Sequence, residues 1–151
     1  MWRRITVPPL GERIIGFSIP REGEVLVISY EGVILLRLGD EITAETDKNA
    51  AECDIYDPNS GVAQYRGKEY HIIGLHGGSP IIESHAGECL ALDGGSETLS
   101  VVIAEETAFS TEYTNFSGDW AAATFSPDGR YIILGCPYDF DLVVLKREAA
   151  T

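Results

Sequence analysis

The sequence predicts an all-β fold built from short antiparallel strands. Runs rich in Val, Ile, Leu and Tyr recur along the chain, and clusters of Gly, Pro, Asp and Asn separate them, as is typical of strands joined by turns. Most connections are about two to five residues long, the length of hairpin loops, so neighbouring strands are expected to pair as antiparallel hairpins. The sequence has no sustained apolar stripe at helical spacing, which argues against long helices.

Each predicted strand is a short apolar run bounded by turn-forming residues. The strands follow one another closely, so tight turns are expected between most of them. In chain order they are Trp2–Val7, Arg13–Ile19, Glu24–Tyr30, Val33–Leu38, Tyr70–Leu75, Pro80–Ser84, Glu88–Leu92, Thr98–Ala104, Trp120–Phe125, Arg130–Cys136 and Phe140–Lys146.

Two segments, Glu41–Ala51 and Ala104–Ala108, have a helix-forming composition. Neither shows a helical apolar stripe, so a turn or two of helix is the most that is expected. A further hairpin is predicted from Glu52–Tyr56 and Gly61–Arg66, joined by the turn residues Asp57–Ser60.

Length and composition indicate a single domain that spans residues 1–151. Hydrophobic residues make up 44% of the chain and charged residues 23%, which is ordinary for a globular protein with a buried core. A chain of this length is too short for two independent cores of normal size.

The charge balance and the cysteines bear on the binding partners and the cellular location of the protein. There are 11 Lys and Arg against 24 Asp and Glu, a formal net charge of -13. This field repels nucleic acids and anionic membranes and attracts a basic protein partner, although excess acid also serves solubility alone. Cys53, Cys89 and Cys136 are widely spaced within or beside apolar runs and are expected to be reduced core thiols. With no signal-peptide pattern, a cytoplasmic location is expected.

Internal repeats organise the predicted strands. Each copy consists of strand, turn, strand, turn and strand. One register makes Gly16 and Gly74 equivalent, and a second register, which matches Glu24-Val25 with Glu69-Tyr70, fits nearly as well. In the first register the copies are residues 14–38, 72–92 and 122–145.

The last repeat carries a family resemblance. Its segment Phe125-Ser126-Pro127-Asp128-Gly129-Arg130-Tyr131-Ile132-Ile133 resembles the first hairpin of a blade in WD40-like and TolB-type β-propellers, and the resemblance is strongest over residues 120–146. Pro127 presets the turn and Gly129 takes a positive φ, while Phe125 and Tyr131 lie on the flanking strands.

The other two copies are more degenerate. Phe17–Leu26 contains the turn Pro20-Arg21-Glu22-Gly23, and the middle copy at His76–Pro80 is looser. The Trp-Asp and Gly-His pairs of the strict WD40 repeat are missing, so the chain resembles β-propellers in general and not the strict WD40 repeat.

The resemblance implies three four-stranded blades per chain. The last blade supplies only three strands, and its fourth is expected to come from Trp2–Val7, because propellers of this kind close by pairing an N-terminal strand with the last blade. Residues 40–68 are expected to hold the fourth strand of the first blade and an insertion. A propeller ring needs four to eight blades, so two chains are expected to form a six-bladed homodimer. A monomeric β-trefoil is the alternative fold.

The sequence predicts neither catalytic residues nor a metal or cofactor site. His71, His76 and His85 lie near Cys89, but strand alternation puts His71 and His76 on opposite faces and the spacing fits no zinc template. The run His76–Ser79 is expected to be a tight turn, because no Gly-x-Ser-x-Gly elbow accompanies it.

Binding residues are instead expected in the loops at one end of the blades, where propellers usually bind their ligands. Aromatic side chains there are suited to anchoring a partner. The predicted binding residues are Tyr113, Phe116, Asp119, Trp120, Tyr138 and Asp139.

These observations favour a non-enzymatic protein-binding or scaffold module. One alternative is an acidic inhibitor or immunity-type protein that neutralises a basic enzyme, which the charge of -13 suggests. A second alternative is a small-molecule sensor or enzyme whose site forms at the dimer axis from residues of both chains.

Overall fold

The protein is described by a computed structural model that covers residues 2–11, 13–50, 52–74, 78–115, 121–136 and 142–148. The predicted all-β class is confirmed, because these residues form antiparallel strands and one four-residue helical turn, α1 (Glu52–Ile55). Within the described ranges, no helix has the length and hydrophobicity required to cross a bilayer.

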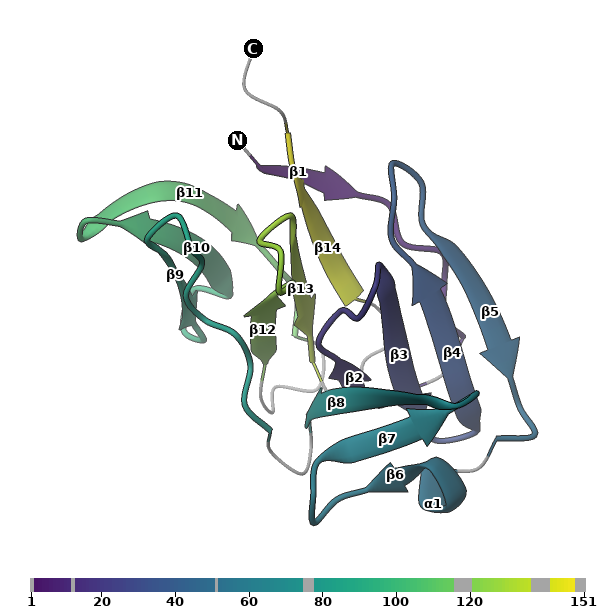
Figure 1. Cartoon of the computed structure of the whole chain (residues 1–151). Coiled ribbons are helices and arrows are strands. Elements are labelled where there is room, and N and C mark those ends of the chain that lie inside the picture. Colours follow the sequence, from purple (N-terminus) through teal and green to yellow (C-terminus); the bar gives the residue numbers. More distant parts are fainter. Residues whose placement is uncertain are drawn as a thin grey trace.

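The strands follow one another closely along the chain (Figure 1). They are β1 (Trp2–Ile5), β2 (Ile14–Ser18), β3 (Glu24–Ser29), β4 (Gly32–Arg37), β5 (Thr43–Asp47), β6 (Tyr56–Asp57), β7 (Val62–Tyr65), β8 (Lys68–Gly74), β9 (Glu88–Asp93), β10 (Thr98–Ile103), β11 (Glu106–Glu112), β12 (Ala122–Phe125), β13 (Tyr131–Gly135) and β14 (Leu142–Arg147).

Three sheets result from the pairing of these strands. A four-stranded sheet has the order β1-β14-β13-β12, a three-stranded sheet the order β11-β10-β9, and a seven-stranded sheet the order β5-β4-β3-β2-β8-β7-β6. The described residues therefore do not group into the three four-stranded blades that the repeats predict.

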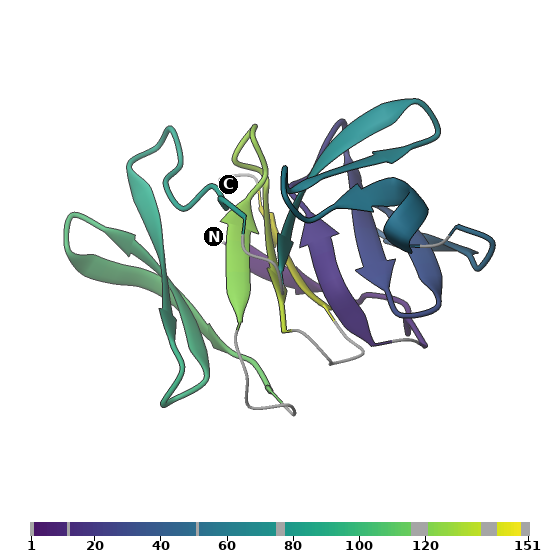
Figure 2. The same ribbon diagram turned by 90° about the horizontal axis from the view of Figure 1, so that it is seen from below.

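The sheets pack face to face around three hydrophobic clusters. The first lies between the four-stranded sheet, called the β1 sheet below, and the strands β2 to β4. It includes Phe17, Val27 and Val144. The second lies between the β1 sheet and the β9 to β11 sheet, and the third lies between β3 and β4 and the hairpin strands β6 to β8. The seven-stranded sheet thus curls over, so that its two halves face each other. In Figure 2, β9 to β11, β12 to β14 and β2 to β5 follow one another from left to right, and β6 to β8 lie above β2 to β5.

Burial on both faces explains the continuous apolar runs of the central strands. In β3, Val25 and Val27 enter the first cluster, while Leu26 and Ile28 enter the third. In β14, Val144 enters the first cluster and Leu145 the second. Strands buried on both faces lose the alternation of polar and apolar residues, so each run of Val, Ile and Leu supplies two cores at once.

The N-terminal strand closes the last sheet, as predicted. β1 pairs antiparallel with β14, with Trp2 opposite Arg147 and Ile5 opposite Val144. Trp2 is 6% exposed and its ring centroid lies 6.0 Å from that of Phe125. The strand thus fills the core of the sheet that its backbone extends.

The content predicted for residues 40–68 is confirmed in part. β5 pairs with the edge of β4 and supplies a fourth strand next to β2, β3 and β4. β6 pairs with β7 around residues 58–61, so a hairpin forms here, but the predicted strand Glu52–Tyr56 is wrong for residues 52–55, which form α1.

The middle repeat does not form a blade, and its predicted strand Pro80–Ser84 is wrong. β8 pairs with β2 and β7, while residues 80–84 contain only an isolated bridge from Glu83 to Cys89. Gly16 and Gly74, equivalent in the predicted repeat, are cross-strand partners. A Cβ atom at Gly74 would lie 2.5 Å from the Ile15 carbonyl oxygen, so the two glycines allow the backbones to approach closely.

The helix-forming composition of Ala104–Ala108 is also overridden. Ala104 and Glu105 have φ values of 50° and 68°, and together they form the two-residue hairpin turn that joins β10 to β11. The alternation that follows places Phe109 against the second cluster, and this burial makes the segment a strand.

Candidate functional site

A groove of about 440 Å³ lies where two hairpin turns meet the outer face of β8. One turn joins β2 to β3 and the other joins β12 to β13, so the groove spans two different sheets. These are the turns of the first and last repeat copies. The repeat analysis predicted both turns, although it did not predict that they meet or that they form a groove with β8.

The β2–β3 turn is a tight two-residue hairpin. The Arg21 amide donates to the Glu24 carbonyl at 2.8 Å, and the Glu24 amide donates back to Arg21 at 2.9 Å. Between them Glu22 and Gly23 have φ values of 53° and 78°, which matches the left-handed turn that two-residue hairpins prefer. The turn fixes Arg21 and Glu22 at the rim of the groove.

The β12–β13 turn is held by its own side chains. The Ser126 hydroxyl donates to Asp128 Oδ1 at 2.6 Å, and the amides of Arg130 and Tyr131 donate to Asp128 and to Ser126, each at 3.0 Å. Gly129 has the predicted positive φ, 74°. The motif that resembles a propeller blade therefore forms a rigid hairpin, as its composition predicts.

Asp128 is ionised at neutral pH. Burial alone raises the pKa of its carboxyl group, but the hydrogen bonds from Ser126 and from the Arg130 amide outweigh burial and hold the pKa below the usual range. The carboxylate therefore brings a fixed negative charge to the groove.

The lining combines apolar walls with charged groups at the rim. Ile19, Pro20, Leu38, Pro127 and Tyr131 supply the apolar surface. Three carboxylates accompany a single guanidinium and one imidazole: the charged and titratable lining residues are Arg21, Glu22, Glu69, His71 and Asp128.

Arg21 carries an unused donor. Its Nη1 atom is buried and has no hydrogen-bond partner among the described residues. A buried donor without a partner costs free energy, on the order of 1–3 kcal/mol, which an acceptor on a bound molecule would recover.

The positive charge of Lys68, next to this groove, is already balanced by carboxylates. Its Nζ atom lies 2.9 Å from Glu24 Oε1 and 3.8 Å from Glu22 Oε2. The hydrogen bond to Glu24 raises the pKa of Lys68. Lys68 is held mainly by Glu24. The charges of Glu22 and Glu69 therefore make the rim of the groove acidic.

The loop residues predicted from sequence do not line this groove. Tyr113 is 5% exposed and packs in the second cluster, where burial raises the pKa of its hydroxyl. Part of Tyr113 lines a separate polar hollow with Arg4 and Glu97. The other five, Phe116, Asp119, Trp120, Tyr138 and Asp139, lie outside the described residues.

The histidines and cysteines whose side chains the structure describes are dispersed over the surface and the core, and His76 lies outside the described residues. His71 lines the groove and His85 is exposed. Cys136 is buried, as predicted for a core thiol, whereas Cys89 is exposed, contrary to that prediction. Cys89 lies on β9 opposite Val102, on the face of the sheet turned away from the second cluster. Within the described part of the chain, no three His, Cys, Asp or Glu side chains gather as a metal site.

The groove residues Arg21, Glu22, Glu69 and Leu38 were not predicted as binding residues. These residues belong to no recognisable binding motif. The groove forms because β8 pairs with the edge of β2, which brings Glu69 and His71 to the two turns. No family model, curated protein sequence or solved structure matches this chain, and the site is therefore defined by its geometry alone.

Proposed function

We propose that the protein is a non-enzymatic binding module of propeller-like type, and that its groove binds a short peptide segment of a basic protein partner. The observation that carries the proposal is the lining, which pairs apolar walls with three carboxylates and one unsatisfied guanidinium donor. Grooves of this kind bury an apolar side chain while a few polar groups fix its orientation.

Each part of the lining has a role in such a complex. Leu38 and Tyr131 contact an apolar peptide side chain, and Glu22 and Glu69 pair with Lys or Arg side chains on either side of it. A rotation of the Arg21 side chain brings the buried Nη1 to a peptide carbonyl, which then accepts its hydrogen bond. The net charge of -13 steers a basic partner toward the protein and raises the association rate.

The stacking of the sheets supports the propeller-like fold. Blades of a propeller pack face to face, as the sheets around the three clusters do, and the last blade takes its outer strand from the N-terminus, as β1 does here. The strands of a trefoil instead close into one barrel capped by hairpins.

A homodimer is part of the same proposal. The three clusters stack the layers in the order β9 to β11, β12 to β14 with β1, β2 to β5, and β6 to β8, so the two ends of the stack are the β9 and β6 groups. A second copy covers both ends by two-fold pairing. Two copies supply eight blade-like layers, in place of the six that the repeats predict.

A pair of probe peptides tests the groove. Acetyl-Arg-Leu-Arg-Leu-amide and its counterpart acetyl-Glu-Leu-Glu-Leu-amide are titrated into the labelled protein while amide chemical shifts are recorded. The basic peptide is expected to shift the amide signals of residues 19, 21–23, 69–71, 126 and 128–131, and the acidic peptide is expected to leave them unchanged. Shifts spread evenly over acidic surfaces, or no shifts at all, would overturn the proposal.

A matched pair of double variants separates the groove from the overall charge. Glu22→Gln with Glu69→Gln is expected to weaken the basic peptide about three- to tenfold, since each exposed ion pair contributes up to about 1 kcal/mol. Glu31→Gln with Glu106→Gln removes the same charge from exposed positions outside the groove. Equal weakening by both pairs contradicts a specific site.

Light scattering tests the homodimer. A single chain has a mass of 16.4 kDa, and about twice that mass is expected in solution. A stable monomer at high concentration overturns the closed ring but leaves the groove proposal intact, because all of the groove's lining belongs to one chain.

A further inference from the structure

Four cations of this acidic chain line one hollow at the end of the β1 sheet. The hollow has a volume of about 520 Å³ and is lined by Arg3, Asp40, Arg130, Lys146, Arg147 and Glu148. The whole chain has 11 Lys and Arg against 24 Asp and Glu, so an excess of cations here runs against the charge of the protein. A local positive potential of this kind favours a bound anion.

Strand register forces two of these cations together. Arg3 on β1 lies directly opposite Lys146 on β14, and Lys146 lies opposite Tyr131 on β13. Like charges directly opposite each other destabilise an antiparallel pair. Burial of Trp2 and Ile5 fixes this register, because a shift by one residue would expose both.

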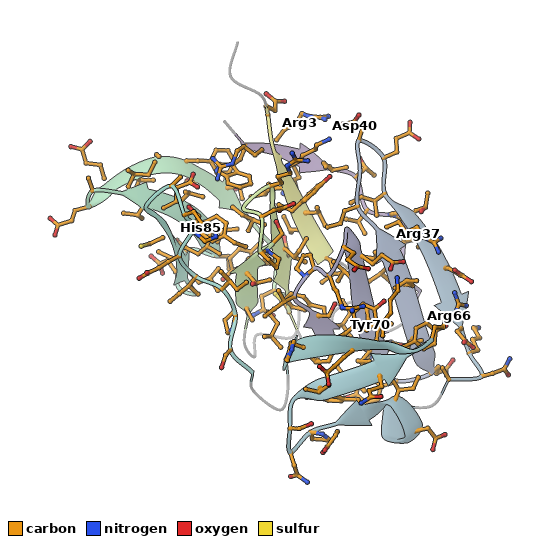
Figure 3. The ribbon with its side chains drawn as sticks, viewed as in Figure 1. Arg3, Arg37, Asp40, Arg66, Tyr70 and His85 are labelled. Atoms are coloured by element: carbon orange, nitrogen blue, oxygen red, sulfur yellow. The ribbon has the colours of Figure 1, made fainter. Side chains whose placement is uncertain are left out.

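The carboxylates that now offset these charges are weakly held. Arg3 Nε lies 3.0 Å from Glu148 Oε1, with the two side chains 51% and 48% exposed. Lys146 pairs with Asp40, which arrives from the β4–β5 connection and lies next to Arg3 in Figure 3. Exposed ion pairs contribute little and are screened by salt, so an anion that binds the cations more tightly displaces these carboxylates.

Arg130 has no such partner among the described residues. Its backbone carbonyl accepts a hydrogen bond from the Arg147 amide at 2.8 Å, which places Arg130 at the same end of the sheet. In the part of the chain that the structure describes, its guanidinium forms no ion pair and is attracted only at longer range by Asp128. Arg147 is already committed to Glu88 and the Gly129 carbonyl. A ligand can therefore bind the donors of Arg130 directly, and those of Arg3 and Lys146 once it displaces Glu148 and Asp40.

We propose that this hollow binds a compact oxyanion of the phosphomonoester class. A guanidinium group can donate two parallel hydrogen bonds to two oxygens of one phosphate, and an ammonium group adds a compact positive charge. Every lining residue is charged, so the charged ends of these side chains are what an anionic group meets in the hollow. The net charge of -13 repels long polyanions, and this restricts the ligand to a small anion.

Calorimetric titration at low ionic strength tests the proposal with three probes: inorganic phosphate, N-acetyl-O-phosphoserine amide and a single-stranded DNA 10-mer. Inorganic phosphate is expected to bind with a dissociation constant in the millimolar range or below. Tighter binding of the phosphoserine compound identifies a protein-borne phosphate as the source, and equal binding identifies the free ion or a small phosphorylated molecule. The proposal is overturned if no phosphate binding is detected at about 10 mM phosphate, or if the oligonucleotide binds more tightly than phosphate.

Matched variants locate the site. Arg3→Gln combined with Arg130→Gln is expected to weaken phosphate binding at least tenfold. Arg37→Gln combined with Arg66→Gln removes the same charge from positions that lie away from Arg3 in Figure 3 and is expected to leave binding within twofold. Circular dichroism of each variant establishes that it is folded. Equal weakening by both pairs shows that only the overall charge matters and overturns the proposal.

Discussion

Glu88 on β9 and Arg147 on β14 form a two-pronged ion pair that joins the β9 to β11 sheet to the four-stranded sheet β1-β14-β13-β12. Arg147 Nη1 lies 3.2 Å from Glu88 Oε2, and Nη2 donates to Oε1. The Glu88 side chain is 5% exposed and also accepts a hydrogen bond from the Ser84 hydroxyl at 2.8 Å. The Arg147 guanidinium lies 4.3 Å above the Trp2 ring, so the pair also contacts the N-terminal strand.

Glu88→Gln is expected to destabilise the protein by about 2–3 kcal/mol. The substitution keeps the shape of the side chain but removes its charge, and a partly buried guanidinium then loses its counter-ion. Urea unfolding followed by circular dichroism measures the change. Glu31→Gln, at an exposed turn position, is the control and is expected to change the free energy of unfolding by less than about 0.5 kcal/mol. Equal effects of the two substitutions would show that the ion pair adds nothing.

The contribution of Glu88 should depend on pH. Burial raises the pKa of its carboxyl group, but the hydrogen bonds from Arg147 and Ser84 outweigh burial and hold the pKa below the ordinary value of 4.5. The folded protein therefore binds this proton less readily than the unfolded chain. The stabilisation is complete above pH 4.5 and is lost as the pH falls toward the lowered pKa.

The difference in unfolding free energy between wild type and Glu88→Gln measures this effect. It is expected to be largest at pH 7 and to shrink below pH 4.5, because protonated Glu88 is then neutral like glutamine. Other carboxylates titrate in both proteins and cancel in the difference. A difference that stays constant from pH 7 to pH 3 would contradict the assignment.

Gly74→Ala is expected to destabilise the protein by about 1–3 kcal/mol. An added Cβ atom would lie 2.6 Å from Cα of Gly16 and 2.5 Å from the Ile15 carbonyl oxygen, so β2 and β8 must move apart. Thermal unfolding measures the loss. Gly94→Ala is the control, since its Cβ atom meets nothing within 4 Å, and it is expected to be neutral or slightly stabilising. Loss of stability in both variants alike would argue against a close approach of β2 and β8.

The local hairpins were the most predictable part of the fold. The turn from Ser126 to Tyr131 and the turn at Glu22-Gly23 form as their compositions indicate, because turn residues act through the few residues around them. The pairing of β1 with β14 was predicted from a strand count, since the last repeat lacks one strand.

The pairing between distant strands was less predictable. The repeat pattern makes Gly16 and Gly74 equivalent positions because each follows two apolar residues. In the structure they lie opposite each other on β2 and β8, where both allow the two backbones to approach closely. Sequence similarity between two strands does not distinguish equivalent positions from neighbouring ones. The groove was missed for the same reason, because His71 and Glu69 reach the two turns only through the β2–β8 pairing.

The two described cysteines should differ in reactivity. Cys89 is exposed on β9, while Cys136 is 3% exposed within the second cluster. Iodoacetamide reacts with accessible thiolates, so brief treatment of the folded protein is expected to modify Cys89 at least tenfold faster than Cys136. Peptide mass spectrometry assigns the modified residue. Cys89→Ser should abolish the fast modification of the β9 peptide, and equal rates at both positions would mean that the β9 to β11 sheet does not cover Cys136.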